Sequence, residues 1–228
     1  MGGARYVRLS IGGAVFQILA TDGGLLEAPV AATEVLLPAA DRVEIALGPF
    51  DEGEELAIEA LAHWRTTIKR RKTERFATLQ AGPAQPSAAV LPERLRTIAP
   101  LAAASASPTR TVEFGVKYSL SRGMDFVINK EMHHRDAPVK VSELQVWDVV
   151  NSTLMDHPFH LHGFFFQVLA VNGKPPAWLS WEDVVNLPPK STTRIAWTPD
   201  DRPGSWMYHC HILEHHAAGM MAHFDVVR

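Results

Sequence analysis

Short apolar runs, each closed by glycine or proline, recur along the chain and predict strands instead of helices. In the first part of the chain they cover residues 6–11, 14–21, 33–37 and 43–47. A second series covers residues 111–118, 124–129, 139–151, 162–171, 191–197, 205–210 and 222–227. No segment keeps a long 3.6-residue apolar period. We therefore expect an all-β chain whose second series forms a Greek-key β-sandwich.

The composition changes between the two series of strands. The sequence from about residue 78 to 110 is rich in alanine, proline and serine, which is typical of a linker or a long wrapping connection. We therefore divide the chain into a partial unit at 1–77, a linker at 78–107 and a complete sandwich at 108–228.

The partial unit offers only four or five strands, which cannot cover both faces of a sheet. Its exposed apolar face and unpaired strand edges would be a liability that proteins usually cover. We expect this unit to pack on the second unit and against copies of itself, which predicts a homo-oligomer.

Charge and hydropathy narrow the classes of partner. The formal net charge of the 228 residues is -3, which argues against nucleic acid or an anionic membrane as the main partner. No apolar run approaches the roughly 20 residues that cross a bilayer. Residues 1–13 lack a basic segment followed by an apolar stretch, so no signal peptide is expected in this chain. Cys210 is the only cysteine, so no disulfide can form within the chain.

Histidines gather near this cysteine. Of the 11 histidines, six fall within residues 157–162 and 209–215. Two imidazoles and one thiolate in a plane, with a distant axial thioether, form the ligand set of an electron-transfer copper. The candidates are His157, Cys210, His215 and Met220. A loop between two strands can fold the last three around one ion, and His157 would come from a neighbouring strand.

Strand alternation predicts a second set of ligands on the opposite side. Residues two apart in an extended segment point the same way, so His160 and His162 would share a face, as would His209 and His211. Cys210 must then point to the other face. One strand would thus contact a copper ion through its thiolate and a second metal cluster through the flanking histidines. The backbone of His209–Cys210–His211 would connect the two sites.

The segments HPFHLHG (157–163) and HCHILEHHAAGMM (209–221) resemble the C-terminal copper motifs of the multicopper oxidases, the laccase-like family. Residues 108–228 resemble the family's whole third cupredoxin domain, and residues 1–60 are similar to the latter part of its second domain. The resemblance implies a cupredoxin-like fold with a partial second cupredoxin unit at the N-terminus. It also implies a type-1 copper at the four candidate residues.

The same resemblance implies roles for the remaining histidines. His160 would be a type-2 copper ligand, and His162, His209 and His211 would be type-3 ligands. With Cys210, these four histidines would be the catalytic residues. The family couples one-electron oxidation of phenols, amines or metal ions to the reduction of dioxygen to water. The partners would be a small reducing substrate and O2, and the location periplasmic or extracellular.

The sequence departs from the family at the oxygen site. The family's trinuclear cluster takes eight histidines, four of them from two further His-x-His motifs, and neither motif occurs here. His63 stands alone, and the adjacent His133 and His134 would point to opposite sides of a strand. This sequence therefore holds half of the cluster, as expected for a C-terminal fragment, an N-terminally truncated form or a chain with a different use.

Two other functions stay open from the residues. A complete type-1 set beside an incomplete cluster fits a blue-copper electron carrier without oxidase activity. The open histidine cluster also fits a hydrolase of esters or lactam-like amides, in which Zn or Cu lowers the pKa of a bound water. Its partner would be a hydrolysable small molecule.

Some nearby residues have weaker claims to a role in the site. His216 and His223 fall outside the ligand spacing, so we expect neither to bind metal. Asp156 and Asp183 are candidates to orient ligand imidazoles as hydrogen-bond acceptors, although turn or surface roles are equally expected.

Overall fold

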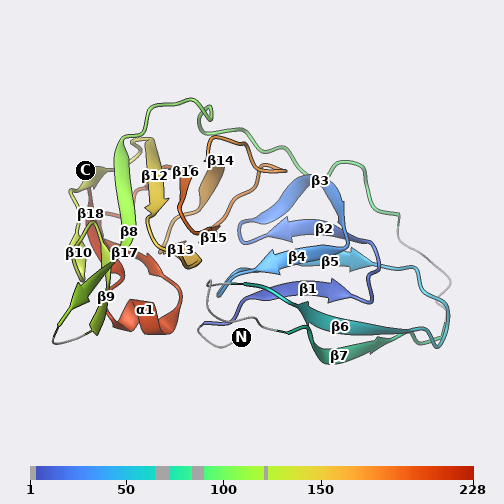
Figure 1. Ribbon diagram of the computed structural model, residues 1–228. Coiled ribbons are helices and arrows are strands. Elements are labelled where there is room, and N and C mark those ends of the chain that lie inside the picture. Colours follow the sequence, from blue (N-terminus) through green and yellow to red (C-terminus); the bar gives the residue numbers. More distant parts are fainter. Residues whose placement is uncertain (1–3, 65–71, 84–89, 121–122) are drawn as a thin grey trace.

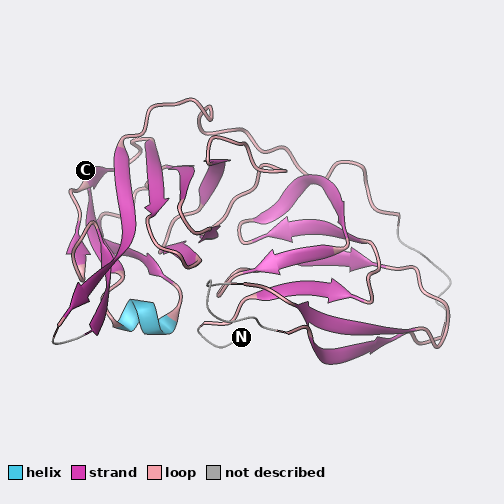
Figure 2. Ribbon diagram, in the orientation of Figure 1, coloured by secondary structure: helices cyan, strands magenta, loops and turns pink. Residues whose placement is uncertain are grey.

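The computed structural model of the protein describes residues 4–64, 72–83, 90–120 and 123–228. These residues are nearly all in strands and loops, and the one helix among them has five residues (Figure 2). No helix in this part of the chain has the length and hydropathy that a membrane crossing needs. Figure 1 shows two groups of strands, which we call the N-terminal unit (residues 7–80) and the C-terminal unit (residues 110–227).

The N-terminal unit has seven strands where the sequence predicts four or five. They are β1 (Val7–Ile11), β2 (Phe16–Thr21), β3 (Gly24–Ala32), β4 (Glu34–Leu37), β5 (Glu44–Leu47), β6 (Glu55–Leu61) and β7 (Glu74–Gln80). They form a four-stranded sheet in the order β4-β1-β6-β7 and a three-stranded sheet in the order β3-β2-β5. Phe16, Ile18 and Leu26 of the smaller sheet form a core on which Val35 of β4 packs.

Two of the unpredicted strands lie at sheet edges. β3 contains Pro29, which lacks a backbone N–H and is tolerated at an edge because one side of the strand is unpaired. β7 is exposed along nearly its whole length. Because it buries no regular face, its sequence shows no alternation of apolar and polar residues. This strand runs to Gln80, into the segment predicted as linker, whose residues 84–89 lie outside the described ones. The division into domains stays a prediction.

The C-terminal unit contains the strands that carry the histidine motifs. Its elements are β8 (Arg110–Ser119), β9 (Gly123–Ile128), β10 (His134–Arg135), β11 (Val139–Lys140), β12 (Gln145–Asn151), β13 (His157–Leu161), β14 (Phe166–Val171), β15 (Val184–Leu187), β16 (Ser191–Trp197), β17 (Gly204–Cys210), α1 (Leu213–Ala217) and β18 (Met221–Val227). One sheet has the order β14-β16-β12-β8-β9. The other has the order β10-β18-β17-β13-β15, with β11 also paired to β18.

A core of aromatic side chains lies between these two sheets. Trp147 and Trp197 come from the first sheet, and Phe159, Tyr208 and Phe224 come from the second; all five are fully buried. Consecutive strands from β12 to β17 alternate between the two sheets, so the connections cross between sheets as in a Greek key. This core fixes the two strands, β13 and β17, that carry the motifs.

The two units pack against each other, as predicted. The N–H of Gly23 donates to the carbonyl of Trp181 at 2.7 Å, and the Tyr6 hydroxyl donates to Asn186 Oδ1 at 2.9 Å. The Tyr6 ring is buried in the core of the C-terminal unit. The N-terminal unit is therefore attached next to β15, the edge strand beside β13.

We expect Gly23→Ala to destabilise the contact between the units. A Cβ at residue 23 would lie 2.3 Å from Trp181 Cβ and 2.6 Å from the Trp181 carbonyl oxygen, so backbone would have to move. Overpacking of this kind costs about 1–3 kcal/mol, which urea unfolding of the purified protein would measure. Gly82→Ala is the matched control, because no described heavy atom lies within 4 Å of a Cβ there. Equal stability of the two variants would contradict this interpretation.

Candidate metal centre

The register between β13 and β17 decides which side chains face each other. The strands are antiparallel, with Phe159 opposite Cys210 and His160 opposite His209. Directly paired residues point to the same face of a sheet, and the face alternates along each strand. His157, Phe159 and Cys210 therefore face the core of the sandwich, and His160 and His209 face away from it. The predicted alternation holds in the structure.

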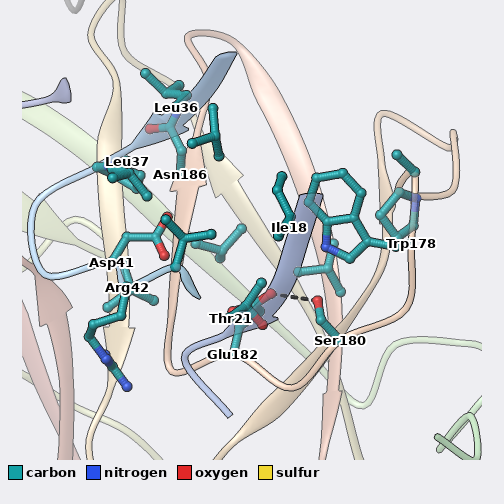
Figure 3. A pocket seen from close by; sticks show the side chains of 18 of the residues that line it. Ile18, Thr21, Leu36, Leu37, Asp41, Arg42, Trp178, Ser180, Glu182 and Asn186 are labelled. Carbon is teal, nitrogen blue, oxygen red and sulfur yellow. Dashed lines mark hydrogen bonds between the residues drawn. The ribbon is translucent and has the colours of Figure 1, made fainter. Parts of the chain in front are cut away.

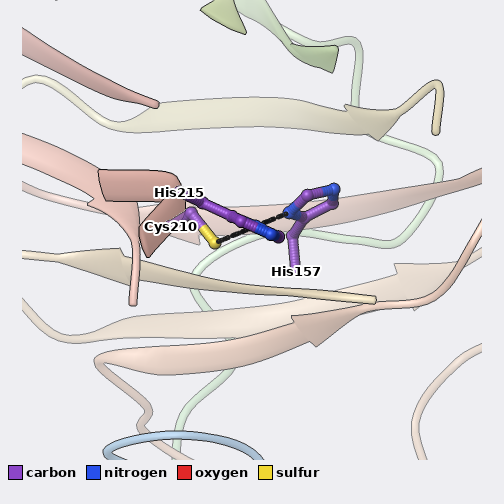
Figure 4. A group of neighbouring side chains, drawn as sticks. All are labelled: His157, Cys210 and His215. Carbon is purple, nitrogen blue, oxygen red and sulfur yellow. Dashed lines mark hydrogen bonds between the residues drawn. The ribbon is translucent and has the colours of Figure 1, made fainter. Parts of the chain in front are cut away.

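Three of the predicted type-1 ligands converge on the core side. Cys210 Sγ lies 3.5 Å from His157 Nδ1 and 3.6 Å from His215 Nδ1, and the two nitrogens lie 3.1 Å apart (Figure 4). Ligand atoms held about 2.0–2.3 Å from one ion in a plane would lie about 3.5 Å apart, so this triangle has the size of a metal site. All three side chains are buried, which excludes water from the sulfur.

A short helix, where the sequence predicts only a loop, presents His215. α1 spans five residues between Cys210 and Met220. The N–H of Cys210 donates to the carbonyl of Met220 at 3.0 Å, and the N–H of Met220 donates to the carbonyl of His215 at 2.9 Å. These bonds close the segment on itself, and the side chain of Met220 is fully buried in the same core as Cys210.

Gly219 and Phe126 fix this segment from outside. Gly219 has φ +107° and lies so close to Met132 that a Cβ would approach the Met132 side chain to 2.7 Å. The ring of Phe126 on β9 stacks on the His215 imidazole, with ring centres 3.8 Å apart and an angle of 18° between the planes. Phe126 was not among the residues expected at the site, because one aromatic residue in a strand carries no distinguishing pattern.

Four histidine rings meet on the reverse side of the same strands. His162 Nε2 and His209 Nε2 are 2.9 Å apart. The ring centre of His160 lies 4.5 Å from that of His162 and 5.4 Å from those of His209 and His211. Ligand atoms of His160, His162 and His209 all lie within 4.8 Å of one another, close enough for one ion to bind all three. The ring centre of His216 lies 4.4 Å from that of His209, so His216 is closer to these rings than its position in the sequence suggests.

Backbone carbonyls orient two of these rings. His160 Nδ1 lies 2.8 Å from the carbonyl oxygen of Asp183, and His209 Nδ1 lies 2.9 Å from that of Cys210. A carbonyl only accepts, so both Nδ1 atoms carry the hydrogen and both Nε2 atoms keep a lone pair. Asp183 thus orients the imidazole of His160 through its backbone carbonyl. The carboxylate of Asp156 instead accepts a hydrogen bond from the side-chain amide of Asn186.

Burial keeps these imidazoles neutral. It lowers the pKa of His160, His162 and His209, the last to about 3, and the neighbouring histidines lower the pKa of His162 and His209 further. Neutral imidazole is the form that binds metals. The reverse side therefore offers lone pairs at neutral pH.

Three further histidines lie outside both sets of ligands. His134 contacts Glu131 through Nδ1 at 2.7 Å, and the ring of His63 stacks on Tyr6. His133 lies next to Gly219, to whose carbonyl its N–H donates. None of the three belongs to a metal-ligand group among the described residues.

Comparison with known proteins agrees with this geometry. The family model for multicopper oxidases matches residues 106–228, more than half of the chain. The chain belongs to the multicopper oxidase family. Copper is therefore the metal that family membership implies, and the thiolate and imidazoles of the core side are ligands suited to it.

Several relatives of this multicopper oxidase chain are known. It is 37% identical over 99 residues to the multicopper oxidase mco of Staphylococcus aureus, which covers 41% of this chain and 22% of that protein. It is 29% identical over 134 residues to the laccase of Bacillus subtilis, covering 49% of this chain and 26% of the laccase. The chain thus spans about a quarter of the length of these relatives.

Solved structures of multicopper oxidases share the fold. The Campylobacter jejuni enzyme, described as a metallo-oxidase, superposes with a TM-score of 0.85 at 28% identity, covering 99% of this chain and 52% of that one. McoA of Aquifex aeolicus gives 0.87 at 26% identity, covering 99% and 53%. The predicted all-β, cupredoxin-like architecture is confirmed.

A cavity of about 250 Å³ lies between the units, and its lining includes Val184, which pairs with His160. Its walls are mostly apolar side chains from both units, including Ile18 and Trp178, and Asp41 and Glu182 are among its few polar residues (Figure 3). Burial raises the pKa of Glu182 to about 7 and, together with Asp22, raises that of Asp41 to about 9.

Side chains of the N-terminal unit hold Asp183 and Val184, which lie beside this cavity. Arg42 forms two hydrogen bonds to the Asp183 carboxylate, at 2.7 and 3.0 Å. Asp22 accepts the backbone N–H groups of Asp183 and Val184, at 3.3 and 3.0 Å. The carbonyl that orients His160 therefore belongs to a residue held by both side chains.

We expect Glu182→Gln to stabilise the metal-free protein at alkaline pH. The pKa of Glu182, about 7 in the folded protein, lies above its ordinary 4.5. The stabilising contribution of the protonated Glu182 side chain is therefore fully present below pH 4.5 and is lost as the pH rises through 7. The glutamine cannot ionise and keeps an oxygen for the Ser180 hydroxyl. The free energy of unfolding at about pH 8 should rise by roughly 1–3 kcal/mol, with little change at about pH 4. The exposed Glu52→Gln serves as control, and an equal gain there would refute this assignment.

Proposed function

We propose that this chain carries the electron-accepting site and half of the oxygen site of a laccase-like multicopper oxidase. His157, Cys210, His215 and Met220 would bind a type-1 copper. His160 as type-2 ligand, with His162, His209 and His211 as type-3 ligands, would supply half of a trinuclear cluster. The observation that carries the proposal is the end of β17 with the residue that follows it, where Cys210 Sγ lies 3.5–3.6 Å from two imidazoles on one face and His209 and His211 lie on the other.

Copper held by these residues would supply one-electron transfer from a reducing substrate, such as a phenol, an amine or a metal ion, to O2. The protein's part is to hold and connect the ligands. Cys210 is covalently adjacent to His209 and His211, so the backbone is the shortest connection between the two sides. The core around Cys210 keeps water from the thiolate, and the carbonyls of Asp183 and Cys210 keep Nε2 of His160 and His209 available.

We also propose a homo-oligomer in the periplasm or outside the cell. β3 and β7 are edge strands, and Leu25 and Phe76 on them are 42% and 52% exposed. Exposed edges with apolar side chains are usually covered by another chain or element. An assembly would also be one way to bring further histidines to the four on this chain.

A blue-copper electron carrier is the second candidate, because the sequence supplies all four type-1 candidates but only four of the eight histidines that a trinuclear cluster takes. The names of the relatives favour copper over zinc, and hence favour either copper function over a zinc hydrolase.

Copper-loaded protein is expected to absorb intensely in the orange-red region, because a thiolate transfers charge to the copper. Cys210→Ser should abolish the band. Met220→Leu should keep it and raise the reduction potential, since the axial ligand tunes that potential. The adjacent Met221→Leu is the matched control and should change neither. A wild-type protein that binds copper at Cys210 without the band would rule out the type-1 site.

Oxygen uptake should depend on assembly. Copper-loaded protein would be separated by size with light scattering, and each fraction assayed for O2 consumption with a phenol or a diamine. We expect uptake only in species larger than one 25.2 kDa chain. Uptake by the single chain would contradict the need for further ligands, and no uptake in any fraction would favour the carrier. Ester hydrolysis lost in His209→Ala but kept in Cys210→Ala would instead support a hydrolase.

A further inference from the structure

The imidazole of His157 is held from the side opposite its metal-facing nitrogen. Its Nδ1 faces Cys210 and His215, while its Nε2 lies 2.9 Å from the Thr153 hydroxyl. Both residues are buried, with Thr153 7% exposed and His157 fully enclosed. The hydrogen on this contact decides which ring nitrogen keeps a lone pair for a metal.

Asn151, at the end of β12, fixes the direction in which the Thr153 hydroxyl donates its hydrogen. Its amide nitrogen lies 2.7 Å from the carbonyl of Met155 and 2.9 Å from the carbonyls of Leu187 and Pro188. Its Oδ1 accepts the backbone N–H of Thr153 at 2.9 Å. Turning the amide over would place its NH2 against that N–H and its oxygen against three acceptors, so only one orientation is allowed.

The Thr153 hydroxyl has a single hydrogen to place. Asn151 Oδ1 lies 2.8 Å away, His157 Nε2 2.9 Å and the Met155 carbonyl 3.2 Å. Two oxygens 2.8 Å apart need a hydrogen between them, and Oδ1 can only accept, whereas Nε2 can itself donate, so the hydroxyl hydrogen goes to Oδ1. The N–H of Met155 donates to the same hydroxyl at 3.1 Å. The hydroxyl therefore presents a lone pair to His157, and Nε2 of His157 must carry the hydrogen.

We propose that Asn151 and Thr153 act as a positioning pair that holds neutral His157 in its Nε2–H tautomer, so that the lone pair for a metal lies on Nδ1. The proposal rests on the type-1 site proposed above. Neither residue belongs to the ligand group of His157, Cys210 and His215. Their effect is to prepare one ligand before metal arrives, and loss of such a partner typically costs 10–100-fold in metal affinity.

Thr153→Val tests the pair, because valine has nearly the same shape and no hydroxyl. Thr153→Ser keeps the hydroxyl and should behave like wild type. Thr193→Val is the matched control: Thr193 is fully buried on β16, and its hydroxyl has no hydrogen-bond partner in the described structure. Thermal unfolding of all three variants shows whether each one folds.

Two measurements test the role of the positioning pair separately from the identity of the copper site. In metal-free protein with 15N-labelled histidine at mildly alkaline pH, the imidazole nitrogen shifts of His157 should show the Nε2–H tautomer in wild type, Thr153→Ser and Thr193→Val. They should show a mixture in Thr153→Val. With copper added, Thr153→Val should bind about 10–100-fold more weakly and shift the orange-red band, while Thr193→Val should not.

An Nδ1–H tautomer in wild type would overturn the proposal. So would a folded Thr153→Val that matches Thr193→Val in both tautomer and copper affinity. A wild type that shows the Nε2–H tautomer but no orange-red band would support the positioning pair and refute the type-1 copper instead.

Discussion

The pairing of β13 with β17 is the constraint on which both ligand sets depend. Placing Phe159 opposite Cys210 puts the thiolate beside His157 and puts His160 beside His209. A slip of one residue would exchange the two faces of the slipped strand and separate each set. The slip is opposed by the fully buried side chains of Phe159, Leu161 and Tyr208, which would have to leave the core. The packing that stabilises the sandwich therefore also selects the arrangement of the ligands.

Bringing several imidazoles together without their metal has a cost that the protein limits through hydrogen bonds. A buried polar group without a partner costs about 1–3 kcal/mol. His160 and His209 each donate to a carbonyl, and His157 contacts a hydroxyl. Because burial also lowers the pKa of His160, His162 and His209, these three rings stay neutral and do not repel one another as cations.

The sequence predicts the parts of this site that follow from a local period. The two-residue alternation of a strand is enough to place Cys210 opposite its flanking histidines, and the spacing of motifs identifies the family. Features without a local pattern cannot be predicted from the sequence in this way. β3 and β7 are edge strands lacking apolar alternation, and α1 is too short to show a helical period. The carbonyl of Asp183 could not be singled out, because every residue has one and only the fold decides which reaches His160.

The two faces of the centre are oriented by different means. On the core side, His157 and His215 are fixed by side chains, Thr153 and Phe126, so their orientation changes when those residues are substituted. On the reverse side the acceptors are backbone carbonyls, which substitution does not remove. One of them belongs to Asp183, which Asp22 and Arg42 hold from the N-terminal unit. Displacement of that unit would therefore disturb His160 directly. It would also withdraw Tyr6 from the core that holds Cys210 and Met220, so the N-terminal unit supports the reverse face through hydrogen bonds and the core face through packing.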